Sequence, residues 1–384
     1  MEKSRKPKIR FKGYNDDWEQ RKLNEFTKYS SSSLTVKDID ETASYDLYDA
    51  NEEIGKTDKS PLFDDYISII KDGAGVGRVR KLPKNTSILG TMGAIIPQNS
   101  DYNFLFSILE KTDFTKLTSG GTIPHIYYNQ YGEKVYSIPT LEEQQKIGQY
   151  FRNLDNLITL HQRKLDKLIN VKKSMLEKMF PKQGSTVPEV RFIGFTEDWE
   201  QRELSNVLER RIEQRQQSEE YPRLAFASGQ GVIPLSERKT NNREQLTKDE
   251  YTKKYLVTEL NDIVYNPANV KYGAIDRNKC GRGLISPIYV TFTTNEISGF
   301  IERIVTSHDF QQRALRFEEG TVTKRQSVNP ENLVTLDILV APKREEQQKI
   351  ATYFDNIDHL ITLHQCELEK LQNIKKSMLE KMFV

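Results

Sequence analysis

EEQQKIGQYFRNLDNLITLHQRKLDKLINVKKSMLEKMF occupies residues 142–180, and EEQQKIATYFDNIDHLITLHQCELEKLQNIKKSMLEKMF occupies residues 345–383. The two stretches are offset by 203 positions and differ at only 10 of 39 positions. Apolar residues recur along both at alternating intervals of four and three, which is the spacing of a helix that packs along a seam against another helix. Each stretch, called here the long repeat, is therefore predicted to form one helix about 58 Å long.

The predicted seams correspond residue by residue. The first consists of Ile147, Phe151, Leu154, Ile158, His161, Leu165, Leu168, Met175 and Met179, and the second of Ile350, Phe354, Ile357, Ile361, His364, Leu368, Leu371, Met378 and Met382. Thr140 and Glu143 fit a capping box at the first helix start, and Pro181 predicts its end. Two stripes this long are predicted to pack against each other as an antiparallel pair. The alternative is that each helix forms one face of its own domain's core.

A second repeat precedes each unique segment. Residues 7–23 read PKIRFKGYNDDWEQRKL and residues 188–204 read PEVRFIGFTEDWEQREL, with 10 of 17 positions identical at an offset of 181. We call this the short repeat. The unique segments, roughly 24–141 and 205–344, show no comparable similarity, and the second is longer by the difference of the two offsets, 203 − 181 = 22 residues. Two distant copies exclude a solenoid of short stacked repeats and indicate a tandem duplication whose middle was free to change.

Composition narrows the class of protein. The 384 residues are 36% hydrophobic and 29% charged with a formal net charge of +2, so any basic surface is local. No stretch approaches the eighteen or so apolar residues that cross a bilayer, and no apolar run follows the basic N-terminus. Cys280 and Cys366 cannot form a disulfide scaffold and lack zinc spacing, so we expect reduced thiols in a cytoplasmic protein.

The unique segments predict mixed helix and strand. Short β-rich runs broken by Gly and Pro fill 64–97 and 261–292, and each is followed by a helical stretch and a polar turn. The expected fold class is therefore α/β in the α+β sense, with two globular domains joined by two long antiparallel helices in a coiled-coil-like, pseudo-two-fold pair. The predicted domains are 1–140 and 183–343, and the predicted helical spacers are 141–182 and 344–384.

Basic residues gather in the glycine-containing loops of both unique segments, and polar residues gather in the later turns. The basic loop residues are Lys71, Arg78, Arg80, Lys81 and Lys84 in the first segment and Lys271, Arg277, Lys279 and Arg282 in the second, where Tyr272 is a further candidate. The polar turn residues are Thr122 and His125, and then Thr323, Lys324, Arg325 and Gln326. Positive loops on a rigid sheet suit contacts to DNA phosphates, and Arg or Gln can read base edges. The alternative for any one of them is an ordinary solvated loop.

Catalytic and cofactor motifs are weak in this sequence. GAGVG at 73–77 is followed by RVRKLPKN, which does not start a helix, so a close-approach loop is favoured over a nucleotide site. NPAN at 266–269 lacks the second proline and the aromatic residue of the amino-methyltransferase motif and is interpreted as a turn. His161 and His364 hold matching seam positions without further ligands nearby and are interpreted as packing residues.

The repeated motifs resemble a known family. Proline, three residues, EQQ, one residue and isoleucine, followed by a long helix, occurs at IPTLEEQQKI (138–147) and APKREEQQKI (341–350), and both helices end in KKSMLEKMF. Together with YNPANVKYGAI and GLISPIYVTF between 265 and 292, and with the GTIPHI turn of the first segment, this arrangement resembles the specificity subunit of type I restriction-modification enzymes.

The resemblance implies a subunit that is not an enzyme. Each variable domain would recognise one part of a split, asymmetric target in double-stranded DNA. The paired helices would set the distance between the parts and dock two methyltransferase subunits, which restriction and translocase subunits then join. S-adenosylmethionine, ATP and magnesium would belong to those partners. The near identity of the long repeats follows if each docks the same partner protein.

Three other classes stay open at this point. A stand-alone DNA-binding regulator with two reading domains would need no enzyme partner. A coiled-coil adaptor would have no role with nucleic acid, which the basic loops argue against. A fused methyltransferase would need cofactor motifs that the sequence does not carry.

Overall fold

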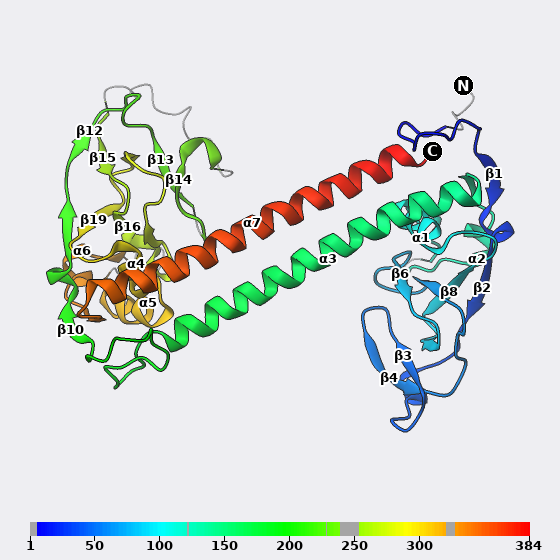
Figure 1. The fold of residues 1–384 in the computed structure, drawn as a ribbon, viewed down its shortest axis with the longest axis horizontal. Coiled ribbons are helices and arrows are strands. Elements are labelled where there is room, and N and C mark those ends of the chain that lie inside the picture. Colours follow the sequence, from blue (N-terminus) through cyan, green and yellow to red (C-terminus); the bar gives the residue numbers. More distant parts are fainter. Residues whose placement is uncertain (1–5, 121–122, 228, 239–252, 320–326) are drawn as a thin grey trace. The chain divides into compact units, whose positions relative to one another are not determined.

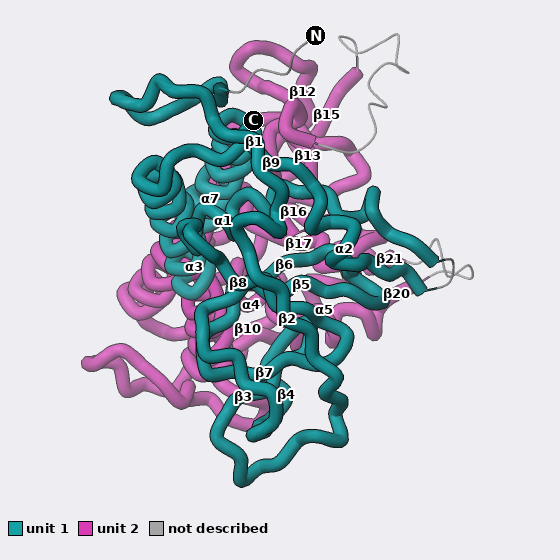
Figure 2. Tube along the Cα trace, turned by 90° about the vertical axis from the view of Figure 1, so that its right-hand side faces the viewer, with its two compact units in different colours: residues 1–164, 364–384 teal, residues 165–363 magenta. Residues whose placement is uncertain are grey.

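The structure is a computed structural model that describes residues 6–120, 123–227, 229–238, 253–319 and 327–384. The chain divides into two compact units, each drawn in its own colour in Figure 2. Unit 1 consists of Met1–Lys164 and His364–Val384, and unit 2 consists of Leu165–Leu363. Each unit therefore contains one globular part and one half of each long helix.

The long repeats form the two long helices of the chain (Figure 1). Helix α3 spans Leu141–Lys178 and helix α7 spans Arg344–Met382. The Thr140 hydroxyl accepts a hydrogen bond from the Glu143 amide at 3.5 Å, as a capping residue does. Helix α3 ends shortly before Pro181, which cannot continue a helix.

The halves of α3 and α7 pack antiparallel inside each unit. In unit 1, Asp155 pairs with Lys375 at 2.7 Å and His161 contacts His364 at 3.1 Å between their Nδ1 atoms, so positions rise along α3 as they fall along α7. In unit 2, Lys172 pairs with Asp358 at 2.5 Å. The predicted antiparallel pair is confirmed. His161 and His364 contact each other across the seam, and they hold the same position of the long repeat.

The globular part of unit 1 is built on a four-stranded antiparallel sheet in the order β2-β8-β5-β6. A three-stranded sheet, β4-β3-β7, forms a second lobe, and β1 pairs with β9. The elements are β1 (Glu19–Lys22), β2 (Thr27–Ser31), β3 (Tyr45–Tyr48), β4 (Glu53–Thr57), β5 (Tyr66–Ile70), β6 (Val79–Leu82), β7 (Thr86–Ile88), β8 (Met92–Pro97), α1 (Tyr102–Lys111), α2 (Tyr128–Tyr131) and β9 (Val135–Ile138).

The globular part of unit 2 has the corresponding sheet in the order β11-β19-β16-β17. Its second lobe holds the sheet β12-β15-β18 and the hairpin β13-β14, while β10 pairs with β22. The elements are β10 (Glu200–Glu203), β11 (Leu208–Arg211), β12 (Gln214–Arg215), β13 (Leu224–Ala227), β14 (Gly231–Pro234), β15 (Tyr255–Thr258), β16 (Ile263–Tyr265), β17 (Ile275–Arg277), β18 (Gly283–Ile285), β19 (Val290–Thr294), α4 (Ser298–Val305), α5 (His308–Ala314), β20 (Glu318–Glu319), β21 (Ser327–Val328), α6 (Pro330–Leu333) and β22 (Asp337–Val340).

The four-stranded sheets of the two unique segments thus share one topology although their residues differ, whereas the second lobes differ. The α+β fold class is confirmed, and in both units a helix, α1 or α4, follows the sheet's last strand in sequence. Fifty-one residues separate β11 from β16, against 34 between β2 and β5. Most of the 22 extra residues therefore lie in the second lobe of unit 2, which contains the hairpin β13-β14.

The end of α7 completes the core of unit 1. Phe383 packs against Trp18, Phe104 and Phe151, with ring centres 6.4, 5.4 and 5.7 Å away. The Ile9 amide also donates a hydrogen bond to the Lys381 carbonyl at 3.0 Å. The last residues of the chain are therefore part of the same hydrophobic core as the short repeat near its beginning.

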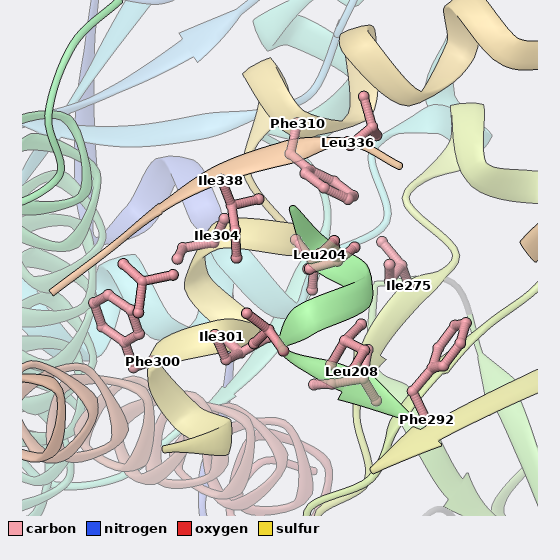
Figure 3. Packing of buried hydrophobic residues seen from close by; sticks show 14 of the residues in the cluster. Leu204, Leu208, Ile275, Phe292, Phe300, Ile301, Ile304, Phe310, Leu336 and Ile338 are labelled. Atoms are coloured by element: carbon pink, nitrogen blue, oxygen red, sulfur yellow. The ribbon is translucent and has the colours of Figure 1, made fainter. Parts of the chain in front are cut away.

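The end of α3 completes the core of unit 2 in the same way. The Phe180 ring lies 5.6 Å from Trp199, 5.7 Å from Phe300 and 6.3 Å from Phe354, centre to centre. Figure 3 shows part of this core, in which Phe300 and neighbouring α4 residues pack with Leu204 of the short repeat. Each KMF ending thus fills an equivalent slot, so packing explains why both helices end in the same residues.

None of the helices in the described part of the chain has the length and apolar character needed to span a lipid bilayer.

Candidate nucleic-acid interface

A buried ion pair joins the short repeat to the long repeat in each unit. Arg10 donates two hydrogen bonds to the Glu143 carboxylate at 2.7 and 2.8 Å, and Arg191 does the same to Glu346 at 2.6 and 2.8 Å. Both glutamate side chains have no exposed surface. Hydrogen bonding to the carboxylate raises the pKa of each arginine above its usual value. The short repeat and the long repeat, which are far apart in sequence, are therefore in direct contact in each unit.

The glutamine after each buried glutamate anchors the helix that follows the sheet. The side-chain oxygen of Gln144 accepts from the Asp101 amide at 3.1 Å, just before α1, and its nitrogen donates to the Pro139 carbonyl at 2.9 Å. Gln347 bonds the Ile297 amide and the Ala341 carbonyl at corresponding places. The EQQ motif is therefore a device that fixes the sheet region against the long helix.

The glycine loop of unit 1 lies against the later polar turn. Residues 71–78 connect β5 to β6 and include Gly73, Gly75 and Gly77, each with φ near +85°. The Gly73 amide donates to the Pro124 carbonyl at 3.0 Å, and Asp72 contacts His125 at 2.7 Å. A side chain at Gly77 would meet Phe114 at 2.5 Å. Two predicted contact segments are therefore brought together as one surface, which we call reading loop 1.

The equivalent connection in unit 2 has different chemistry. Between β16 and β17 the NPAN stretch opens a 3-10 helix, Pro267–Tyr272, and the Asn266 side chain caps it through the Ala268 amide. Lys271 pairs with Glu318 of β20 at 3.7 Å, so this connection also lies against the later turn. We call it reading loop 2.

Each reading loop presents an exposed aromatic side chain. Tyr272 is 66% exposed in reading loop 2, and Tyr127 is 53% exposed beside His125 in reading loop 1. Such side chains, with Lys71 and Lys271 in the same loops, suit contacts to phosphates, sugars and base edges. Tyr127 was missed by the sequence analysis, which followed charge and glycine content rather than aromatic residues.

The other predicted basic residues of unit 1 lie in three different environments. Arg78 and Arg80 donate to Asn51, in the turn between β3 and β4, and so brace the second lobe. Lys81 is partly buried over the Phe106 ring, where desolvation lowers its pKa. Lys84 lies on an exposed turn.

In unit 2 the most buried of the predicted basic residues, Arg277, forms ion pairs inside the protein. The Arg277 side chain is only 11% exposed and contacts Glu302 at 2.6 Å and Asp355 at 2.7 Å. Lys279 and Arg282 are about half exposed, and their carboxylate partners are Glu302 for the first and Glu220 and Glu259 for the second. Exposed ion pairs contribute little to stability, so Arg282 can exchange partners. The Glu302 partner of Lys279 is instead only 3% exposed and is also bound by Arg277.

Five predicted contact residues lie outside the described residues. They are Thr122 in the first turn and Thr323, Lys324, Arg325 and Gln326 in the second. Across the ranges that the structure describes, no three histidine, cysteine or carboxylate side chains gather in a way that could hold a metal ion.

Each globular part thus has a reading loop on a sheet that is fixed to a long helix, which is an arrangement that suits a macromolecule-binding protein. Comparison with known proteins gives the family. Residues 15–170 match the family model described as the type I restriction modification DNA specificity domain.

Similarity extends over the whole chain. The type I restriction enzyme MjaVIII specificity subunit of Methanocaldococcus jannaschii is 24% identical over 95% of this chain and 91% of its own length. The crystal structure of the type I restriction-modification system S subunit from M. genitalium has the same fold, with a TM-score of 0.64 over 99% of both chains and 16% identity. The resemblance to type I restriction-modification specificity subunits is confirmed by these comparisons. Specificity subunits recognise DNA and leave catalysis to other subunits, so this chain is not an enzyme.

Proposed function

We propose that this chain binds a bipartite, asymmetric target in double-stranded DNA, with one globular part for each half-site. It docks two methyltransferase subunits through its long helices, and restriction subunits join that complex. The observation that carries the proposal is the contrast between a twice-repeated set of supporting contacts and two dissimilar reading loops.

The difference between the reading loops supports an asymmetric target. Reading loop 1 is a glycine-rich connection with a His–Asp pair, whereas reading loop 2 is a capped 3-10 helix with a protruding tyrosine. The two loops form equivalent connections of the two corresponding sheets, between β5 and β6 and between β16 and β17. Side chains that differ in shape and hydrogen-bonding groups select different base edges. Two such loops fit two different half-sites rather than a palindrome.

A repeated outward stripe on the helices supports the docking of partner subunits. Lys146, Tyr150, Asn153, Leu157 and Leu160 follow one another at intervals of four and three along α3, and Lys349, Tyr353, Asn356, Leu360 and Leu363 repeat them along α7. The leucines are 40–46% exposed, so packing inside this chain does not account for their identity. An exposed apolar stripe at helical spacing suits a helix of another protein.

The duplicated stripe also supports the number of partners. Because identical exposed leucines occur on both helices, one partner surface fits at two places. The proposed partner is the methyltransferase subunit, and S-adenosylmethionine, ATP and magnesium are assigned to the partner subunits. The proposed location is the cytoplasm, where those subunits meet host DNA.

The function is tested by methylation sequencing of host DNA that carries this chain together with its methyltransferase partner. A control strain carries the partner alone. We expect one bipartite motif that is modified only when this chain is present. If an active partner binds the chain and no new motif appears, the recognition proposal is wrong. Stable purification of a DNA-binding chain that never associates with the partner would favour a stand-alone regulator.

The docking stripe is tested separately by exchanging Leu157 and Leu160 for glutamate. We expect co-purification of methyltransferase to fall from two subunits to one, because the stripe on α7 stays intact. The matched variant changes Thr159 to glutamate, an exposed position between the two leucines, and keeps both subunits. If the double variant still binds two methyltransferase subunits, the exposed leucines are not the docking site.

A further inference from the structure

A hollow in the second lobe of unit 2 has no part in the reading loops. Its volume is about 460 Å³, and it lies between the hairpin β13-β14 and the loop that joins β17 to β18. The side chains that matter here are Gln217, Arg223, Ser236, Cys280 and Arg282. Only Arg282 was singled out from the sequence. The others lack the clustered charge that a sequence analysis follows.

Stacking on buried tyrosines holds the arginine side chains in place. The Arg223 guanidinium lies 3.6 Å from the ring centre of Tyr255, which is 4% exposed. Arg215 and Arg282 lie 4.8 and 5.4 Å from the ring centre of Tyr221, which is 7% exposed. A guanidinium that stacks on a fixed aromatic ring is attracted by its π-electrons and keeps its plane. The hollow therefore has preformed walls.

Arg223 differs from its neighbours in its electrostatic partners. Arg215 pairs with Glu213 at 2.6 Å, and Arg282 pairs with two glutamates at 2.6 and 2.9 Å. Among the residues that the structure describes, Arg223 has no carboxylate partner, and its Nε group is buried without a hydrogen bond. The side-chain oxygen of Gln217 is also buried without a donor. Unpaired buried polar groups cost free energy, and that cost is recovered when a ligand supplies partners after a small side-chain rotation.

We propose that this hollow is a second specificity-determining contact of unit 2, which binds the edge of a DNA base pair. Arg223 donates to an acceptor on the base edge, and Gln217 accepts from a neighbouring amino group. The inference rests on the proposed function, because it assigns the hollow to the half-site that unit 2 reads.

The pair of groups favours a base edge over a phosphate. A phosphate offers only acceptors and would leave the Gln217 oxygen unpaired, and the glutamates beside Arg282 would repel it. In the major groove, adenine presents an acceptor beside an amino donor, and a guanine–cytosine pair presents the guanine O6 beside the cytosine amino group. The hollow therefore selects among base pairs rather than strengthening DNA binding in general.

The hollow belongs to unit 2 alone among the described parts of the chain because the hairpin that walls it lies in the longer unique segment. The hairpin is packed closely, since a Cβ at Gly283 would meet Leu224 at 2.7 Å and a Cβ at Gly231 would meet the Asp276 carboxylate at 2.1 Å. Close packing keeps the hollow open before DNA arrives. We therefore expect it to affect one half-site only.

The test uses the full chain with its methyltransferase partner and compares Arg223→Ala and Gln217→Ala with the unchanged chain by methylation sequencing. We expect discrimination at one or two base pairs of one half-site to fall by between about fivefold and a hundredfold, which is the range for one good side-chain contact to a base. The other half-site stays unchanged. The matched control is Arg215→Ala, which removes a stacked arginine whose charge is already paired.

Each outcome decides something. An unchanged motif in both variants overturns the role of the hollow, while the proposed function stands if the unchanged chain still gives a bipartite motif. If the alanine variant at Arg223 unfolds, Arg223→Lys keeps the charge but loses the stacked fork, and the same relaxation at one half-site is expected. Equal loss of both half-sites by a folded Arg223→Lys variant also contradicts the proposal. Absence of any motif with the unchanged chain counts against the proposed function instead.

Discussion

Units 1 and 2 attach their sheets to the same pair of helices by different chemistry. In unit 2, Asp355 of α7 receives Arg277 from β17 and Arg303 from α4, at 2.7 and 2.8 Å. The corresponding position of α3 is Arg152, so that carboxylate has no counterpart in unit 1. There, Lys375 of α7 pairs with Glu110 of α1 and with Asp155 of α3, both at 2.7 Å.

This difference also concerns which positions of the long repeat are the same in both copies. Residues that contact the short repeat, such as Glu143 and Glu346, are the same in both copies. Asp355, which pairs with Arg277 and Arg303 of the second unique segment, is replaced by Arg152 in the first copy. The ten differences between the repeats therefore include a contact to a unique segment.

A second difference between the long repeats, Gly148 against Ala351, depends on steric contacts. A Cβ at Gly148 would meet the Asp101 side chain at 2.1 Å and the Phe104 amide at 2.8 Å. Its counterpart Ala351 fits because Gly299 of α4 makes room, with only 3.0 Å between the Ala351 Cβ and a Cβ built at Gly299. Each unit thus places one small residue where the long helix crosses the helix that follows the sheet.

The largest expected effect comes from breaking a supporting contact that both units share. Arg10→Ala leaves the Glu143 carboxylate buried and unpaired, so we expect unit 1 to lose about 3–5 kcal/mol of unfolding free energy. Arg191→Ala should do the same to unit 2. Hydrogen exchange resolved by unit measures both, and each variant is the control for the other. Equal loss of protection in both units from either variant would contradict independent supporting contacts.

Truncation of the helix ends is expected to be slightly weaker. Phe383→Ala opens a cavity beside Trp18 and should destabilise unit 1 by about 3–4 kcal/mol, whereas Phe180→Ala should destabilise unit 2. The partly exposed Phe180 should cost less than the buried Phe383. Denaturant unfolding followed by tryptophan fluorescence distinguishes them, because Trp18 and Trp199 each report on one unit. A Phe383 variant that altered only Trp199 would contradict the assignment of the slot.

Exchanging glycine and alanine at the matched positions 148 and 351 should lower the unfolding free energy of the two units by different amounts. Gly148→Ala forces the Asp101 cap to move and should cost unit 1 about 1–3 kcal/mol. The reverse change, Ala351→Gly, should cost unit 2 about 1 kcal/mol through helix propensity. Thermal unfolding of both variants gives the comparison. Two equal losses would show that sterics at this crossing are not what distinguishes the repeats.

The last expected effect depends on pH and is confined to unit 2. Burial, with the nearby Glu302 carboxylate, raises the pKa of Asp276 from 3.8 to about 6. The folded state therefore holds a proton that the unfolded state releases, so the unfolding free energy falls as pH rises from about 4 to 6. Asp276→Asn keeps an oxygen for the Arg277 amide and should add about 1–2 kcal/mol at pH 7 but little at pH 4. A gain of the same size at both values would rule out titration of this carboxyl group.

The sequence predicted those features that depend on periodic or repeated residues. The seams of α3 and α7 were visible because apolar residues recur over nearly forty positions, and the shared order of elements followed from turn residues. The environment of Arg277 was not visible, because its carboxylate partners lie 25 and 78 positions away. The sequence alone therefore does not distinguish a basic loop residue that faces solvent from one that joins a buried ion-pair network.

The contact residues were harder to predict for a similar physical reason. Asp72 and His125 are 53 positions apart, so their meeting depends on the sheet register rather than on local propensity. Arg223 and Gln217 could not be predicted as contact residues, because the sequence does not show that an arginine stacks on a tyrosine or that an amide has no hydrogen-bond partner. Identity between the two copies at exposed positions was the one available sign of Leu157 and Leu160.

The position of Phe383 has a consequence for synthesis on the ribosome. The slot beside Trp18, Phe104 and Phe151 is filled by the Phe383 side chain, which is translated about 200 residues after Pro181. At ordinary translation rates the roughly 200 residues after Pro181 take about 10–40 s to make. A helix of 38 residues cannot bend its own KMF ending back to its start, so the slot stays open throughout that interval. The first half of the nascent chain therefore has an apolar slot that fits the KMF ending of another copy as well as its own.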